Sequence, residues 1–145
     1  MERRVVVTGV GLVSSLGLGN QENWDGLLSG RSGIRRITHF DPTEFASTIA
    51  GEVPNFDPLQ FVSKKDVKKM DVFIQYAIAA SEFALLDANL PANGELGIET
   101  GVFLASGIGG FGTIEREHRA LLNGGPRKIS PFFIPSAIIN LAAGQ

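Results

Sequence analysis

Three glycines in the stretch SGIGGFG have the spacing of a phosphate-binding loop. Gly107, Gly109 and Gly112 form a G-x-G-x-x-G pattern between an apolar run and a helix-like segment. In dinucleotide-binding folds, such glycines let the backbone approach a pyrophosphate at a helix N-terminus, and an acidic residue about 20 positions further on binds the ribose. The segment RKISPFFIP stands at that place and contains no acid. The pattern therefore favours a structural turn with close backbone packing over a nucleotide site.

A second group of side chains with potential chemistry is basic. Lys65, Lys68 and Lys69 are spaced so that a helix would place them on one face. Arg127 and Lys128 add a basic pair in a proline-containing segment. A solvated surface explains such a cluster in most proteins, and the more specific hypothesis is a docking patch for an acidic protein partner.

The other titratable residues give little support for catalysis. His39 and His118 lack the spacing of a metal-binding pair, and the chain has no cysteine to act as a nucleophile or a thiolate ligand. No serine lies in a G-x-S-x-G pattern. The acidic pairs are interpreted as exposed helix or loop charge; they are Glu115 with Glu117 and Glu95 with Glu99. We therefore expect no metal site and no cofactor.

Alternating strands and helices must position these residues, which predicts the α/β class. Strands are expected at 4–8, 48–53 and 101–106, the last as a central strand because its apolar run is continuous. Asn20 and Ser63 are residue types that cap helices, and Gly30 would follow the end of the first helix. Helices are expected over residues 21–28, 63–70, 71–88, 113–123 and 136–143. Of these, 71–88 is the longest, with an apolar face of Phe73, Tyr76, Ala77, Ala80, Phe83 and Ala84.

Composition narrows the class of protein further. The 145 residues are 43% hydrophobic, which suits one packed globular domain. The net charge of −2 gives no basic field for nucleic acid, and no apolar stretch has the length of a membrane span. We expect a soluble cytoplasmic chain with neither a nucleic-acid nor a membrane partner. Its last predicted helix reaches the C-terminus without a stop signal, which is expected of a chain cut short.

Several longer motifs resemble one family. The segments RRVVVTGVGLVSSLG, GRSGI, SKKDVKKMDVFIQYA, SGIGGFG and above all NGGPRKISPFFIPS are similar to the β-ketoacyl-ACP synthases, most closely the type II elongating enzymes of bacterial fatty-acid synthesis. The resemblance covers all 145 residues. It implies a thiolase-like α/β fold of layered helices and mixed sheet, working as a homodimer. Residues 1–145 would then be an incomplete N-terminal part of its N-terminal domain.

The resemblance also implies an activity. In this family an acyl chain passes from acyl carrier protein to a cysteine, and decarboxylative Claisen condensation with malonyl-ACP gives β-ketoacyl-ACP. This chain has no cysteine, and neither of its histidines matches a catalytic position of the family. No catalytic residue is carried over, and the 145 residues alone are expected to be inactive.

Particular positions match the family's binding surfaces. Ile108 matches a side chain in the acyl pocket that helps set chain length, with Gly107 beside it. Phe133 matches a residue contributed across the dimer interface to the partner's pocket. The positions that match the carrier-protein docking surface are the basic ones: Lys65, Lys68, Lys69, Arg127 and Lys128.

Three hypotheses follow. The chain is the N-terminal portion of an elongating synthase, or of a non-catalytic partner that resembles a chain-length factor, or it is an independent dinucleotide-binding domain, which the missing acid weakens. We also expect that the isolated chain does not persist as a soluble monomer. The reason is that strand 101–106 and the last apolar helix would be exposed and prone to aggregation.

Overall fold

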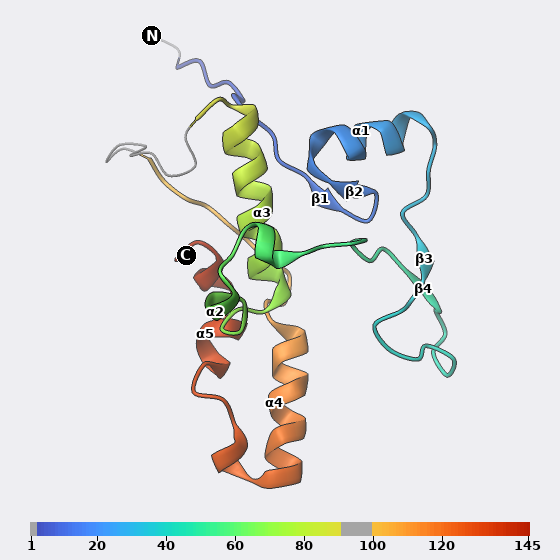
Figure 1. Ribbon diagram of the computed structural model, residues 1–145, viewed down its shortest axis with the longest axis vertical. Coiled ribbons are helices and arrows are strands. Elements are labelled where there is room, and N and C mark those ends of the chain that lie inside the picture. The colour runs from blue at the N-terminus through green and yellow to red at the C-terminus, as the bar shows by residue number, and fades with distance from the viewer. Residues whose placement is uncertain (1–2, 91–99) are drawn as a thin grey trace. The chain divides into compact units, whose positions relative to one another are not determined.

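The computed structural model describes residues 3–90 and 100–145 (Figure 1). The described chain consists of short strands and helices in two compact units. One unit comprises Met1–Asp57 with Ala80–Ala92, and the other comprises Pro58–Ala79 with Asn93–Gln145. The helix α3 (Val72–Asp87) contributes its first half to the second unit and its second half to the first.

Two short antiparallel strand pairs form the sheets of the first unit. In one pair β1 (Val13–Ser14) lies beside β2 (Gly17–Leu18), with Val13 opposite Leu18. In the other pair β3 (Arg35–Arg36) lies beside β4 (Ile49–Ala50). The strand predicted at 48–53 is thus present only as β4, and its partner β3 was not predicted.

Helix α1 (Gly19–Leu28) is held by a buried polar residue. Asn23 donates from Nδ2 to the carbonyl oxygens of Gly17 and Gly19, at 2.9 and 2.8 Å, and accepts a hydrogen bond from Ser14 Oγ. The predicted cap Asn20 lies within the helix, and its side-chain amide donates to the Val10 carbonyl instead. The apolar face that includes Trp24 is exposed. The helix ends shortly before Gly30, as expected.

The N-terminal segment packs along the second half of α3 without forming a strand. A Cβ on Gly11 would overlap the carbonyl oxygen of Ala80, and one on Gly9 would overlap that of Ala84, so only glycine permits this approach. Val10 N also donates to Asp87 Oδ2 at 2.9 Å. The prediction of a strand at 4–8 is wrong: Val5 is 90% exposed, and these residues pair with no strand in the described chain.

Helices dominate the second unit. Helix α2 (Lys64–Val67) is capped by Ser63, as predicted, although it ends three residues earlier than expected. The 3-10 turns η1 (Pro58–Gln60) and η2 (Pro126–Lys128) precede α2 and follow α4. Helix α4 (Phe111–Gly124) begins two residues before its expected start and packs against α5 (Phe133–Ala137) and η2 (Figure 1).

Two further predictions for this unit are wrong. The helix expected over 136–143 is divided, because Ile138 has an extended backbone between α5 and η3 (Ile139–Ala142). The central strand expected at 101–106 does not form among the described residues, and Phe103 is 95% exposed. A continuous apolar run indicates burial, but a strand also needs a neighbouring backbone to accept and donate its hydrogen bonds.

The core of the second unit is small. Ile74 and Thr113 are fully enclosed, and Val62, Ala79, Ala137 and Ala142 are buried around the helix contacts. On α3 the buried residues are Ile74, Gln75 and Ala79. The six residues of its predicted apolar face are only half-buried.

Candidate functional site

The glycine loop before α4 lies against α5. Gly109 N donates to Ser106 Oγ at 3.0 Å, and Gly110 N donates to the Ala137 carbonyl at 2.9 Å. Gly109 has a φ of +80°, and a Cβ there would lie 2.5 Å from the Ala137 carbonyl oxygen. Gly109 therefore permits a tight turn, and Gly109 and Gly110 permit the close contact with α5.

The N-terminus of α4 already has an anion beside it. Asp71 is 8% exposed, and its Oδ2 accepts a hydrogen bond from Thr113 N at 2.8 Å. A pyrophosphate in a dinucleotide fold would use these first-turn amides. The loop also follows residues that form no strand in the described chain. The geometry therefore argues against the dinucleotide-binding hypothesis.

The predicted acyl-pocket residues all lie in the second unit. Ile108 projects from the glycine loop with 67% of its surface exposed. Gly107 precedes it, and within the described part of the chain no atom lies within 4 Å of where its Cβ would be. Phe133 is half-buried and begins α5, the helix against which the glycine loop packs. One junction therefore holds the backbones of Ile108 and Phe133.

The predicted docking lysines surround an acidic residue that sequence reasoning did not consider. Lys65 and Lys68 are exposed, whereas Lys69 Nζ lies 2.8 Å from Asp66 Oδ1 and 5.9 Å from the centre of the Phe132 ring. Hydrogen bonds from Lys69 and then from Ser63 lower the pKa of Asp66 below its usual value. Asp66 therefore remains ionised and offsets part of the charge of Lys69, while Lys65 and Lys68 present theirs to solvent.

A buried glutamate anchors the segment that follows the second basic pair. Arg127 and Lys128 are exposed on η2. Glu117 of α4 is 6% exposed, and its Oε2 accepts from Ser130 N at 2.8 Å, which ties this loop to the helix. The interpretation of Glu117 as exposed charge is wrong. Glu115 and Glu117 are two residues apart and so lie on different helix faces. This spacing could have indicated from the sequence that the two glutamates differ in exposure.

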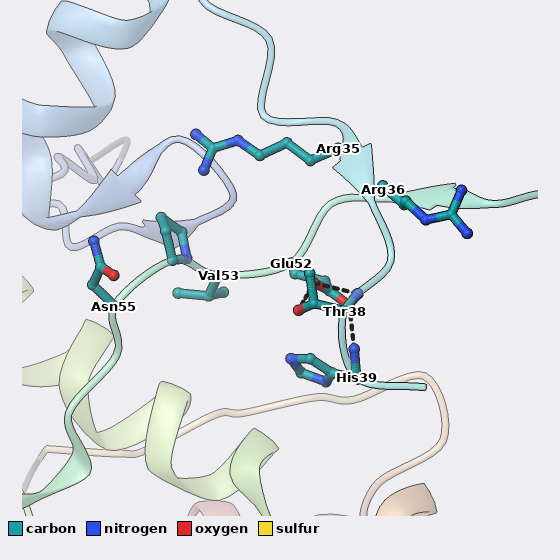
Figure 2. A pocket seen from close by; sticks show the side chains of 8 residues that line it. Arg35, Arg36, Thr38, His39, Glu52, Val53 and Asn55 are labelled. Atoms are coloured by element: carbon teal, nitrogen blue, oxygen red, sulfur yellow. Dashed lines mark hydrogen bonds between the residues drawn. The ribbon is translucent and has the colours of Figure 1, made fainter. Parts of the chain in front are cut away.

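A surface hollow of about 220 Å³ opens beside β3 and β4 in the first unit (Figure 2). Glu52 accepts hydrogen bonds from Thr38 N at 2.9 Å, Thr38 Oγ1 at 2.7 Å and His39 N at 3.2 Å. The Thr38 hydroxyl is the main cause of a lowered Glu52 pKa. Figure 2 shows the Arg35 and Arg36 side chains directed away from each other, and both are exposed. Glu52 thus uses its carboxylate to stabilise the backbone of residues 38 and 39, which gives no sign of a catalytic role.

The two histidines and the pair Glu95–Glu99 are the remaining residues that the sequence analysis considered for catalysis or metal binding. His39 is exposed at that hollow, and His118 is exposed on α4. Glu95 and Glu99 lie outside the described residues. Over 3–90 and 100–145, the structure brings together no group of three or more histidine or carboxylate side chains that could hold a metal ion. None of the helices in those ranges has the length and apolar character needed to span a membrane.

Comparison with known proteins identifies the family. The model of the β-ketoacyl synthase N-terminal domain matches residues 2–145, and the chain belongs to this family. The 3-oxoacyl-[acyl-carrier-protein] synthase 2 of Vibrio cholerae is 52% identical over 144 residues, which are 99% of this chain and 35% of that protein. The chain thus spans about one third of the length of the curated relatives it matches.

Solved structures agree with this assignment. The ishigamide ketosynthase/chain length factor has a TM-score of 0.83 and 34% identity, over 98% of this chain and 36% of that one. A ketosynthase solved with its type II polyketide acyl-carrier protein has a TM-score of 0.80 and 26% identity, over 100% of this chain and 39% of that one. The family resemblance and the thiolase-like α/β class predicted from the sequence are confirmed.

Proposed function

We propose that residues 1–145 are the N-terminal part of a 3-oxoacyl-ACP synthase of fatty-acid elongation. The 52% identity to a synthase of that name carries the proposal. In the complete protein, the carbanion formed when malonyl-ACP loses carbon dioxide attacks the carbonyl carbon of an acyl thioester, whose C–S bond breaks to release the thiol, and β-ketoacyl-ACP results. The chain described here contributes no nucleophile to this reaction. Its proposed contribution is part of an acyl pocket, part of a carrier-docking surface and part of a dimer interface.

The glycine loop supports the pocket assignment. Ile108 is a large apolar side chain that is exposed on an anchored loop, as expected of a residue that contacts an acyl chain. Each buried methylene contributes about 0.8 kcal/mol, which corresponds to about fourfold in binding. In the complete protein, Ile108→Phe should therefore lower kcat/KM about fourfold for each methylene it excludes, and long acyl chains should suffer more than short ones. Ile34→Phe, at an exposed isoleucine of the first unit, is the matched control.

The exposed cations support a carrier-docking surface. A ketosynthase of similar fold is known in complex with an acyl-carrier protein, and Lys65, Lys68, Arg127 and Lys128 are all exposed on the second unit. Single exposed ion pairs contribute less than about 1 kcal/mol, so several must act together and binding must weaken with salt. The charge reversal Lys68→Glu with Lys69→Glu should raise the KM for acyl-ACP, whereas Arg35→Glu with Arg36→Glu, the same change of charge elsewhere, should not. An unchanged KM at low salt would contradict the docking assignment.

The activity itself is tested on the complete protein. With acyl-ACP and malonyl-ACP it should release carbon dioxide and form a β-ketoacyl-ACP two carbons longer than its acyl substrate, detected by mass. Residues 1–145 alone should form none. A complete protein that is inactive alone, yet alters the product length of an active synthase when the two are mixed, would instead support the second candidate. That candidate is a chain-length-factor-like partner, which the likeness to a ketosynthase/chain length factor favours.

The proposal includes a homodimer in the cytoplasm. Phe133 is half-buried at the start of α5, and its neighbours Phe132 and Ile134 are exposed, which supports a second copy covering this apolar surface. Sedimentation of the complete protein should give twice its chain mass. Monomer at micromolar concentration would remove the cross-interface role of Phe133.

A further inference from the structure

Asp71 joins three helices of the second unit. Its carbonyl accepts from Ile74 N at 3.1 Å in the first turn of α3, and its own backbone N–H donates to the Ser136 carbonyl of α5 at 3.3 Å. Its carboxylate accepts from Thr113 N of α4 at 2.8 Å, across 42 residues of sequence. A single buried residue thus connects the starts of α3 and α4 with the body of α5.

The glycine loop is pressed into this junction. A Cβ on Gly110 would lie 3.0 Å from Asp71 Cβ and 2.9 Å from the Ser136 carbonyl oxygen. Ile108 stands two residues earlier, and its side chain is mostly exposed. The position of Ile108 therefore depends on the backbone anchors that follow it, which are the Gly109–Ser106 bond and the Gly110 contacts with α5 and Asp71.

The chemistry of Asp71 suits an anchor. Carboxylates interact favourably with the N-terminal end of a helix, and hydrogen bonds from backbone amides to a charged acceptor are stronger than those between neutral groups. The bond to Thr113 is buried, so its loss leaves an amide without a partner away from water, which is costly. Such a contact holds the first turn of α4, which directly follows the loop, more firmly than an exposed ion pair can.

We infer that Asp71 is a positioning residue that fixes Ile108 and thereby sets how sharply the pocket discriminates acyl-chain length. This inference depends on the proposed synthase function. When Asp71 is present, the loop 106–110 holds Ile108 at one depth in the pocket. When the anchor is lost, Ile108 yields to longer chains, and the difference between long and short substrates diminishes.

The test compares substitutions at Asp71 in the complete synthase. Asp71→Ala removes the acceptor. It should raise the ratio of kcat/KM for a long over a short saturated acyl-ACP about tenfold, because Ile108 then yields to the longer chain. Asp71→Asn keeps an oxygen that accepts from Thr113 N, and it should restore the ratio to within about twofold of the original. A merely structural residue would lower kcat/KM by one common factor for every chain length, and that result would overturn the inference.

A matched control removes a buried hydrogen-bonding residue elsewhere. Asn23→Ala deletes the side chain that accepts from Ser14 and donates to the Gly17 and Gly19 carbonyls in the first unit. It should lower stability without changing the chain-length ratio. An equal change of the ratio in Asn23→Ala and Asp71→Ala would show a general loss of order, and so would also overturn the inference.

Amide hydrogen exchange separates this inference from the proposed activity. Exchange at Gly109, Gly110 and Thr113 should quicken in Asp71→Ala and remain near the original in Asp71→Asn. If Asp71→Ala does not fold, the shorter polar side chain of Asp71→Ser takes its place. A wild-type protein that forms no β-ketoacyl product would refute the proposed function, while unchanged exchange at these three amides would refute the anchor.

Discussion

Two glycines of the same loop should differ greatly in how much stability the protein loses when a methyl group is added. Gly110 has φ −80° and ψ +63°, the backbone of an inverse γ-turn in which Phe111 N donates to the Gly109 carbonyl, and alanine can adopt this conformation. A Cβ there would nevertheless lie 2.7 Å from Ala137 Cα, 2.9 Å from the Ser136 carbonyl oxygen and 3.0 Å from Asp71 Cβ. Two of these atoms belong to the backbone of α5 and cannot turn aside as a side chain could. Gly110→Ala therefore requires the loop and α5 to move apart.

The expected magnitude follows from that geometry. Forcing an extra methyl group into a well-packed site costs about 1–3 kcal/mol, and contacts to backbone place Gly110→Ala in the upper part of this range. Gly107→Ala is the matched control, because a Cβ there meets no described atom within 4 Å. Its effect should stay within about 0.5 kcal/mol.

Urea unfolding of the complete protein measures both variants. With a denaturant slope of about 2 kcal/mol per molar, a loss of about 2 kcal/mol lowers the midpoint by about 1 M in Gly110→Ala, while Gly107→Ala leaves it nearly unchanged. The slope itself should be the same in both, since the surface exposed on unfolding does not change. Equal midpoints in the two variants would refute the close packing of this loop on α5.

Three other predictions concern the cap of α2, the hydrogen-bonded Glu52 carboxylate and the docking surface. Ser63→Ala removes the α2 cap and should lower the free energy of unfolding by about 1 kcal/mol in the same urea assay. Carboxyl NMR titration should give Glu52 a pKa below its usual value, and Thr38→Val should raise it. Because the pKa of Glu52 is lower in the folded state, its hydrogen bonds stabilise the fold at pH values above the unfolded pKa. This stabilisation disappears as pH falls through the folded pKa. Added salt should raise the KM for acyl-ACP in the wild type and do so less in Lys68→Glu with Lys69→Glu; an equal rise in both would contradict docking through these lysines.

The helices were the features most accessible from sequence. Helical periodicity and caps are local signals, so α3 and the Ser63 cap were predicted within one or two residues. The strands at 4–8 and 101–106 were predicted wrongly because their apolar runs report burial but say nothing of a pairing partner. Pairing is a property of two segments, and a window along one of them cannot contain it.

The candidate site was also only partly predictable from the sequence. The glycine loop and the cations around Lys68 are recognisable from residue type and spacing. Asp71 and Glu117 are not, because their partners Thr113 and Ser130 lie 42 and 13 residues away and share no period with them. Both carboxylates accept from backbone amides, and any residue type except proline could supply such a donor.

The contact between the N-terminal segment and α3 also has a consequence in time. Val10 bonds to a residue 77 positions later, and ribosomes add about 5–20 residues per second, so the partner of Val10 emerges about 4–15 seconds after Val10 itself. During that interval Gly9, Val10 and Gly11 have no helix to pack against. Slowing translation before residue 80 should therefore lower the yield of folded protein more than slowing it afterwards.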